Sequence, residues 1–180
     1  MGVDKAWIGS IDDPLASHVA RALLGAGCES VLLVGGDGRR AAAAGWEWIP
    51  DHDPGAGPLG GVVTASLRHR HEPLLVAACD LPDIDAADLT PLVAEVMERG
   101  ADVAAFDLDG RTPGSATALS ARATDVAVDR FRSGERSMWR TFTSTRLVQR
   151  RLEPARPDAL ADADRPEDLP ERLRPPRSTG

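Results

Sequence analysis

The sequence predicts a three-layer α/β fold, in which a mostly parallel β-sheet lies between two layers of helices. Short apolar runs alternate along the chain with stretches of helical periodicity, as in strand–helix–strand units. The run 74–79 is continuously apolar, which is typical of a central strand buried on both faces. A length of 180 residues with 42% hydrophobic content is enough for one domain with its own core.

Strands are expected where short apolar runs end at turn residues. Residues 31–34 stop at Gly35 and Gly36, and residues 46–49 alternate in polarity before Pro50. The other expected strands are 74–79, 102–106, 116–119 and an edge strand at 146–151.

Helices are expected between these strands, where apolar residues recur every three or four positions. Residues 14–26 carry such a face and stop at Gly27. Residues 58–70 begin with Pro58, which is favoured at the first helical position. The remaining expected helices are 86–99, 121–132, 137–142 and 166–173.

The domain organisation is simple. We expect a single domain over residues 1–173 and a flexible tail over residues 174–180, because the tail is polar and contains prolines. The chain shows no internal repeat.

Composition excludes several classes of function. The chain has 21 Lys and Arg against 28 Asp and Glu, a net charge of −7, and no basic run, so a nucleic-acid partner is not expected. No apolar stretch approaches the ~18 residues of a membrane span, and the N-terminus does not resemble a leader for export. Two cysteines far apart suit a reducing compartment, so we expect a cytoplasmic protein.

The first candidate site residue is Asp80, which directly follows the apolar run 74–79. In open α/β sheets, ligands bind beyond the carboxyl ends of the strands. A carboxylate at this point suits Mg²⁺, which is commonly held by one or two protein carboxylates together with substrate phosphates. The local sequence is explained equally well by an aspartate that caps the turn before Pro82.

The second candidate is the glycine-rich segment 51–61, which joins another strand to a helix. Glycines allow a planar ligand to approach the backbone, and a helix N-terminus favours anionic groups. A Gly/Pro turn with close helix packing would also explain the local pattern. Because this segment and Asp80 leave the same predicted sheet edge, the sequence favours a nucleotide site.

Two basic residues are weaker candidates. Lys5 can neutralise phosphates as a compact charge, although a lysine near a terminus is usually solvated. Arg136, within Gly-Glu-Arg-Ser, can bind an anionic substrate group, although a solvent-facing role is commoner for a loop arginine.

Taken together, these segments resemble the molybdenum cofactor guanylyltransferases, a family of nucleotidyltransferases. The resemblance rests on the order and spacing of segments 1–6, 57–61, 79–82, 134–137 and 162–169, with Asp51, and spans residue 1 to about residue 170. It implies a Rossmann-like nucleotidyltransferase fold. It also implies transfer of GMP from GTP to the terminal phosphate of molybdopterin cofactor, with release of pyrophosphate.

The resemblance further implies roles for single residues. Lys5 and Asp80 match the phosphate-binding lysine and the Mg²⁺ ligand, and are the expected catalytic residues. The expected nucleotide-binding residues are Lys5, Asp51, Gly57, Leu59, Gly60, Gly61 and Asp80. Arg136 and Asp164 are expected to bind the other substrate. The implied partners are GTP, molybdopterin cofactor, and a cofactor-donor protein or an acceptor molybdoenzyme.

One part of the family pattern differs. Family members begin with a strand and a glycine-rich loop of the form Leu-Ala-Gly-Gly, whereas the printed sequence starts at Met1, the methionine after that loop. We therefore expect the first strand and most of the phosphate loop to be missing, which leaves two neighbouring strands with unpaired backbone groups. Two alternatives stay open. One is another small-molecule nucleotidyltransferase, such as a cytidylyltransferase; the other is a non-catalytic domain that binds nucleotide or cofactor.

Overall fold

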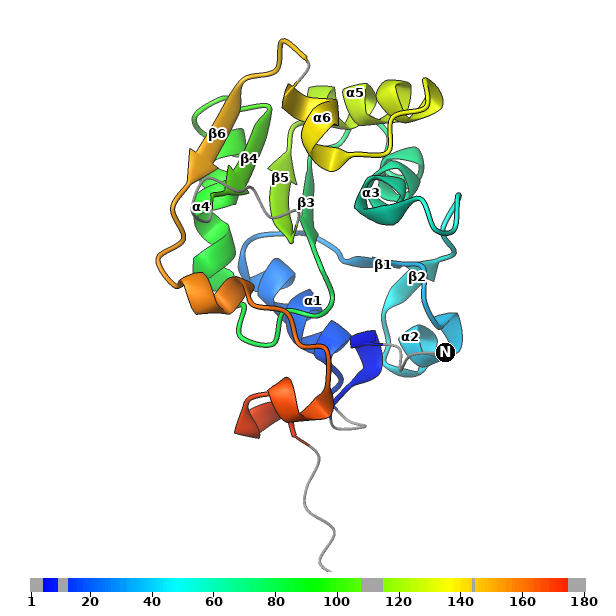
Figure 1. Cartoon of the computed structure of the whole chain (residues 1–180), viewed down its shortest axis with the longest axis vertical. Coiled ribbons are helices and arrows are strands. Elements are labelled where there is room, and N and C mark those ends of the chain that lie inside the picture. Colours follow the sequence, from blue (N-terminus) through cyan, green and yellow to red (C-terminus); the bar gives the residue numbers. More distant parts are fainter. Residues whose placement is uncertain (1–4, 10–12, 108–114, 144, 175–180) are drawn as a thin grey trace, which may run out of the picture.

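The computed structural model describes residues 5–9, 13–107, 115–143 and 145–174. Residues 1–4 of the N-terminal motif and residues 175–180 of the expected tail lie outside this part of the chain. A four-stranded sheet runs through the upper body of the molecule, and a pair of short strands lies beside it (Figure 1).

The strands form two sheets. In the first, β1 (Leu32–Val34) pairs in parallel with β2 (Glu47–Ile49). The second has the order β3-β5-β4-β6, built from β3 (Leu74–Ala77), β4 (Val103–Phe106), β5 (Ala116–Leu119) and β6 (Gln149–Leu152).

Strand directions confirm the prediction of a mostly parallel sheet. Strand β5 is antiparallel to both β3 and β4, and β6 is parallel to β4, so β3, β4 and β6 run the same way. In the described part of the chain no backbone ladder joins β1 to β3.

The helices connect the strands. They are α1 (Leu15–Gly25), α2 (Gly38–Ala43), α3 (Gly57–Arg68), α4 (Ala86–Met97), α5 (Ala121–Arg132) and α6 (Met138–Thr143). Four single 3₁₀ turns accompany them: η1 (Lys5–Trp7), η2 (Pro157–Leu160), η3 (Pro166–Asp168) and η4 (Glu171–Leu173). None of the helices in the described ranges has the length and apolar character that crossing a membrane requires.

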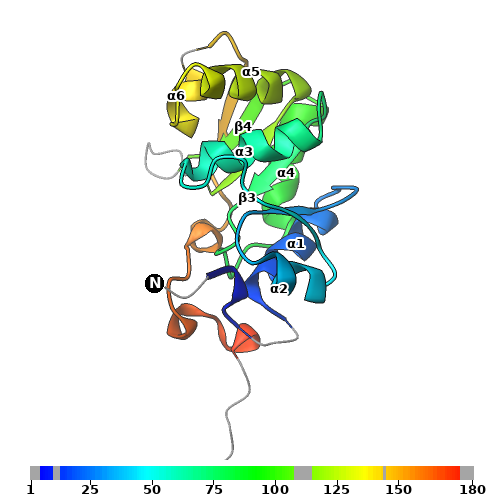
Figure 2. The same ribbon diagram turned by 90° about the vertical axis from the view of Figure 1, so that its right-hand side faces the viewer.

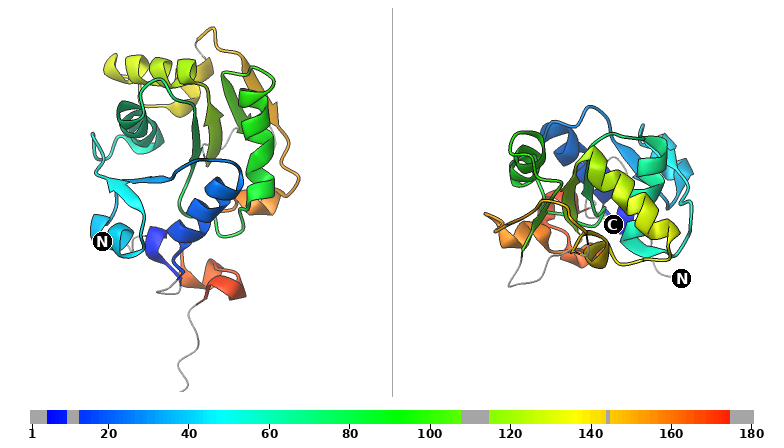
Figure 3. Two further views of the ribbon diagram at one scale, coloured as in Figure 1. Left: turned by 180° about the vertical axis from the view of Figure 1, so that it is seen from behind. Right: turned by 90° about the horizontal axis from the view of Figure 1, so that it is seen from above.

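The larger sheet is covered on both faces (Figure 2). Helices α1 and α4 lie side by side on one face, as the view from behind shows (Figure 3), and their apolar residues pack with Ala104 and Phe106. Helices α3, α5 and α6 pack on the other face with Val103 and Leu119. Because successive strand residues point to opposite faces, one short strand contributes to both cores.

Two expectations about single elements were wrong, and one helix was not expected. The helix expected at 166–173 is two 3₁₀ turns, because Pro170 between them cannot donate the helical hydrogen bond. Strand β3 ends at Ala77, so Cys79 lies beyond the strand and is exposed. Helix α2 was not predicted. Its six residues are too few for a periodic pattern, and its N-terminus is set by the Asp37 side chain, which accepts from two backbone amides.

The C-terminal segment packs against the N-terminal end of the described chain. Ile8 and Leu15 form a small core with three late residues, Ala163, Leu169 and Leu173. The Ala163 amide donates to the Asp80 carbonyl at 2.8 Å, so the late segment also lies beside the end of β3. This packing carries residues from the two ends of the sequence to the same edge of the larger sheet.

Candidate active site

Three residues singled out from the sequence meet at this edge. The Lys5 ammonium is hydrogen-bonded to the Asp164 carboxylate, and its nitrogen lies 3.6 Å from Oδ2 of Asp80. Lys5 and Asp80 are 159 and 84 positions from Asp164 along the chain, so only the fold brings them together. The side chains of Lys5 and Asp80 are 40% and 21% exposed, which leaves the pair accessible to a ligand.

Local structure holds each member of this cluster. Lys5 lies in η1, which is followed by buried Ile8, whose amide donates to the Lys5 carbonyl at 3.2 Å. Asp164 lies in a turn whose backbone is held by Asp168, because the Asp168 carboxylate accepts from the Asp164 and Arg165 amides at 3.1 and 2.9 Å. Asp80 lies three residues after the end of β3, and its carbonyl accepts from the Ala163 amide at 2.8 Å.

The cluster is electrostatically coupled. The hydrogen bond that Lys5 donates to Asp164 raises the pKa of Lys5, with further contributions from the charges of Asp164, Asp80 and Asp162, while desolvation acts in the opposite direction. The hydrogen bond and charge of Lys5 lower the pKa of Asp164. Because both members of that pair are solvent-exposed, their attraction is worth little and an incoming phosphate can compete for Lys5.

Asp51 lies at the carboxyl end of the smaller sheet. Its side chain lies against Gly35, where an added Cβ would be 2.5 Å from Asp51 Oδ2. Gly35 has a φ of +75°, and its carbonyl accepts from the Trp48 indole at 2.6 Å. Across the described ranges no hydrogen bond or ion pair joins Asp51 to Lys5 or Asp80. The described contacts therefore bring together Lys5, Asp80 and Asp164 but do not include Asp51 in that cluster.

The predicted glycine-rich segment forms the start of α3. The N-cap, Ala56, gives no side-chain cap, and the second residue is Pro58, so the first-turn amides of Gly57, Leu59 and Gly60 have no side-chain acceptor from the cap. The Leu59 side chain is fully buried, so this residue can offer a ligand only its backbone. Gly60 allows close packing, because an added Cβ would lie 2.8 Å from the Ala56 Cβ.

Arg136 does not join the Lys5 cluster. Its guanidinium lies 3.4 Å from the Asp53 carboxylate, on the loop that carries Asp51. It also donates to the carbonyls of Phe131 and Glu135. The structure thus connects this predicted substrate-binding residue to the predicted nucleotide-binding loop, and no contact between Arg136 and Asp164 is found in the described part of the chain.

The donor set suits Mg²⁺ held together with a substrate. No group of three or more His, Cys, Asp or Glu side chains in the described ranges is placed to hold a metal ion by itself. Asp80 supplies one accessible carboxylate at the end of β3. Mg²⁺ often takes only one or two protein carboxylates and completes its shell with phosphates and water. A binding mode that uses Asp80 and a triphosphate therefore fits the residues present.

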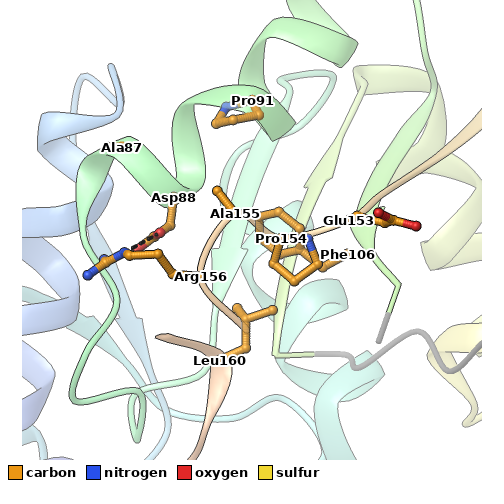
Figure 4. Close-up of a pocket in the computed structure, with 9 residues that line it drawn as sticks. All are labelled: Ala87, Asp88, Pro91, Phe106, Glu153, Pro154, Ala155, Arg156 and Leu160. Atoms are coloured by element: carbon orange, nitrogen blue, oxygen red, sulfur yellow. Dashed lines mark hydrogen bonds and ion pairs between the residues drawn. The ribbon is translucent and has the colours of Figure 1, made fainter. Parts of the chain in front are cut away.

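A small cavity lies elsewhere, between α4 and the segment after β6 (Figure 4). Its volume is about 80 Å³, below the ~300 Å³ of a typical ligand pocket. Arg156 at its rim donates to Asp88 at 3.0 Å and to Asp85, the N-cap of α4, at 2.6 Å. These contacts explain the cavity as part of the capping of α4.

Two features of the site were missed by sequence reasoning. The Asp53–Arg136 contact joins residues 83 positions apart, and no local pattern links them. The close approach of Gly35 to Asp51 was also missed, although the pair Gly35-Gly36 at a strand end was a visible signal for backbone of positive φ.

Comparisons with known proteins identify the family of this chain. The model of the MobA-like NTP transferase domain matches residues 1–156. A probable molybdenum cofactor guanylyltransferase of Opitutus terrae is 34% identical over 176 residues, covering 93% of this chain and 86% of the relative. The chain belongs to the MobA-like NTP transferase family. The resemblance noted in the sequence, and the nucleotidyltransferase class that it implies, are thus confirmed.

Other members and neighbours of the family are more distant. A molybdenum cofactor guanylyltransferase of Pseudomonas fluorescens is 31% identical over 98 residues, which cover 54% of this chain and 47% of that protein. The crystal structure of molybdopterin-guanine dinucleotide biosynthesis protein A from Archaeoglobus fulgidus is 21% identical with a TM-score of 0.70, covering 93% of this chain and 88% of that one. A CMP:2-keto-3-deoxy-manno-octonic acid synthetase complexed with CTP is 14% identical with a TM-score of 0.67, covering 91% and 88%. At such low identity, the two structures establish the shared MobA-like fold alone.

Proposed function

We propose that this MobA-like protein transfers GMP from GTP to molybdopterin cofactor and releases pyrophosphate. The observation that carries the proposal is the pairing of Lys5 with Asp80 at the carboxyl end of β3. Such a pair gives one cationic and one metal-binding group at a single accessible point, which is what a triphosphate requires. The names of the two guanylyltransferase relatives support GTP and molybdopterin as the substrates.

In the proposed reaction, an oxygen of the acceptor's terminal phosphate attacks the α-phosphorus of GTP. The bond between the α-phosphorus and the oxygen bridging to the β-phosphate breaks, and pyrophosphate leaves. Lys5 exchanges its contact with Asp164 for a phosphate oxygen and offsets charge there. Asp80 would hold Mg²⁺, which neutralises phosphate charge and polarises the phosphorus.

The remaining residues would bind the two substrates. The first-turn amides of Gly57, Leu59 and Gly60, together with Gly61 and the Asp51 carboxylate, are proposed to bind the nucleoside part of GTP. Asp164 is proposed to lie beside the acceptor. Binding of GTP would release Asp164 from Lys5, which would couple the binding of the two substrates. A cofactor-donor protein or an acceptor molybdoenzyme is the proposed macromolecular partner. A cytoplasmic location is proposed, because the two cysteines of the sequence are few and far apart.

A nucleotide panel tests the choice of GTP. Thermal unfolding is measured with GTP, CTP, ATP and UTP, each with and without Mg²⁺. Preferential stabilisation by GTP with Mg²⁺ is expected, since a ligand that binds only the native state raises its stability. Stabilisation by CTP alone would replace the proposal with a cytidylyltransferase. Stabilisation by GTP without any turnover in the presence of molybdopterin would favour a non-catalytic binding domain.

A further inference from the structure

We infer that Arg136 is a positioning residue that holds the loop before α3 in its nucleotide-binding shape. The inference rests on the proposed function, because it assigns that loop to GTP. Arg136 Nη2 lies 3.4 Å from Oδ2 of Asp53. Asp53 is two residues after Asp51 and four before Gly57, so the contact falls in the middle of the loop.

Arg136 is itself held by the end of α5. Its Nη1 donates to the carbonyls of Phe131 at 3.0 Å and Glu135 at 2.9 Å, and its guanidinium carbon lies 3.9 Å from the centre of the Phe131 ring. An ion pair between half-exposed side chains is usually worth little, partly because two flexible chains must be ordered. Here the guanidinium is already ordered by three other contacts, which reduces that cost.

A groove of about 330 Å³ lies between the loop and α5, lined by His52 on the loop, by Val63 and Leu67 of α3, and by Phe131 and Arg136. Ala56, the last residue of the loop, packs against the apolar core that contains Phe131, so packing supports the end of the loop. The side-chain contact from the α5 side to the centre of the loop is the one that Arg136 makes with Asp53. The loop contains Gly55 and leads into α3 at Gly57, both with positive φ, which gives this backbone conformational freedom when nothing restrains it.

The two ends of the loop are fixed by other contacts. The His52 amide donates to Thr64 Oγ1 at 3.1 Å, and the Ala56 amide donates to the Asp53 carbonyl at 3.1 Å. Asp53 thus takes part in both contacts: its side chain pairs with Arg136, and its carbonyl closes the turn that leads into α3. Loss of Arg136 releases the loop centre, and GTP then has to order it on binding.

The test compares Arg136→Gln with Arg132→Gln. Arg132 lines the same groove, and its nearest carboxylate is Asp129 on its own helix, 3.9 Å away. Calorimetry measures the Kd for GTP with Mg²⁺ and without acceptor, and amide hydrogen exchange follows residues 52–57. We expect Arg136→Gln to raise the Kd about five-fold, equivalent to about 1 kcal/mol, and to speed exchange of the loop. Arg132→Gln should leave both unchanged.

Two further variants separate positioning from other roles. Arg136→Lys keeps the positive charge but loses the planar guanidinium group. A Kd for GTP between those of wild type and Arg136→Gln is therefore expected. In a double-mutant cycle, Asp53→Asn should add little to Arg136→Gln, because both remove the same contact. Additive effects in that cycle would contradict the inference.

The outcomes also distinguish this inference from the proposed function. A raised KM for molybdopterin with an unchanged Kd for GTP would make Arg136 an acceptor-binding residue and overturn the inference. Unchanged loop exchange in Arg136→Gln would overturn it whether or not the protein turns over. A wild-type protein that binds GTP but transfers no GMP would refute the proposed function. In that case the Kd for GTP and the exchange rates of the loop would still test the positioning role of Arg136.

Discussion

The ammonium nitrogen of Lys5 lies 3.6 Å from Oδ2 of Asp80, although the two residues are 75 positions apart in the sequence. The contact exists because the 3₁₀ turn that carries Lys5 packs, through Ile8 and Leu15, on the segment that contains Ala163. That segment is in turn hydrogen-bonded to the Asp80 backbone. The polar pair therefore depends on a small apolar core, and its geometry is set before any substrate arrives.

Replacing either partner of the Lys5–Asp164 hydrogen bond should change GTP binding in opposite directions. Lys5→Met removes a phosphate-binding charge, so the Kd for GTP should rise about ten-fold or more. Asp164→Asn removes the carboxylate that competes with phosphate for Lys5, so the Kd should fall by a small factor. Calorimetry with GTP and Mg²⁺ measures both. Equal affinity in wild type and Lys5→Met would show that Lys5 is only a solvated surface charge.

Gly35→Ala should weaken GTP binding by displacing Asp51. The new Cβ would lie 2.5 Å from Asp51 Oδ2, so that carboxylate has to move. Gly45→Ala is the matched control, because Gly45 also has positive φ but nothing lies within 4 Å of an added Cβ. Both variants should lose about 1 kcal/mol of stability from the left-handed backbone, while only Gly35→Ala should raise the Kd for GTP. Equal Kd values in the two variants would remove Asp51 from the nucleotide site.

Gly60 and Gly61 are neighbours in α3 with opposite expected effects on stability. Gly60→Ala places a Cβ 2.8 Å from the Ala56 Cβ and should cost roughly 1–3 kcal/mol. Gly61→Ala meets nothing within 4 Å and should stabilise the helix by roughly 0.5–1 kcal/mol. Urea unfolding of both variants gives the comparison. A tolerated Gly60→Ala would mean that the turn before α3 is less tightly packed than the structure indicates.

The carboxylate of Glu135 should make stability pH-dependent near α6. Hydrogen bonds from the Ser137 and Arg136 amides lower the pKa of Glu135 from its usual 4.5. A lowered folded-state pKa gives a contribution that is complete well above pH 4.5 and is lost as the pH falls through the folded value. The stability difference between wild type and Glu135→Gln should therefore be constant at neutral pH and shrink in acid. A difference that stayed constant as the pH fell through the acid range would contradict this role for Glu135.

Much of the fold could be predicted from the sequence, because the apolar runs and turn residues that mark strands and helices are local patterns. The apolar run 74–79 predicted β3 to within two residues, and the limits of β5 and α5 were predicted correctly. The roles expected of Lys5 and Asp164 rested mainly on the resemblance, and the contacts of Lys5 with Asp80 and Asp164 were not predicted, since no spacing rule relates residues so far apart. The role of Asp53 could not be predicted, because the end of α5 meets the loop before α3 only through tertiary packing.

The proposed transfer of GMP is tested most directly by following the α-phosphorus and the γ-phosphorus of GTP into the products. Purified protein, Mg²⁺ and molybdopterin are incubated with GTP labelled at the α- or the γ-phosphorus, and products are separated for wild type, Asp80→Asn and the control Asp129→Asn. We predict that α-label enters a molybdopterin–GMP product and γ-label enters pyrophosphate. Asp80→Asn should slow transfer about 10²-fold or more while leaving the unfolding curve similar, and Asp129→Asn should behave as wild type. Absence of α-label from the acceptor in the wild-type reaction, or full activity of Asp80→Asn, would contradict the account.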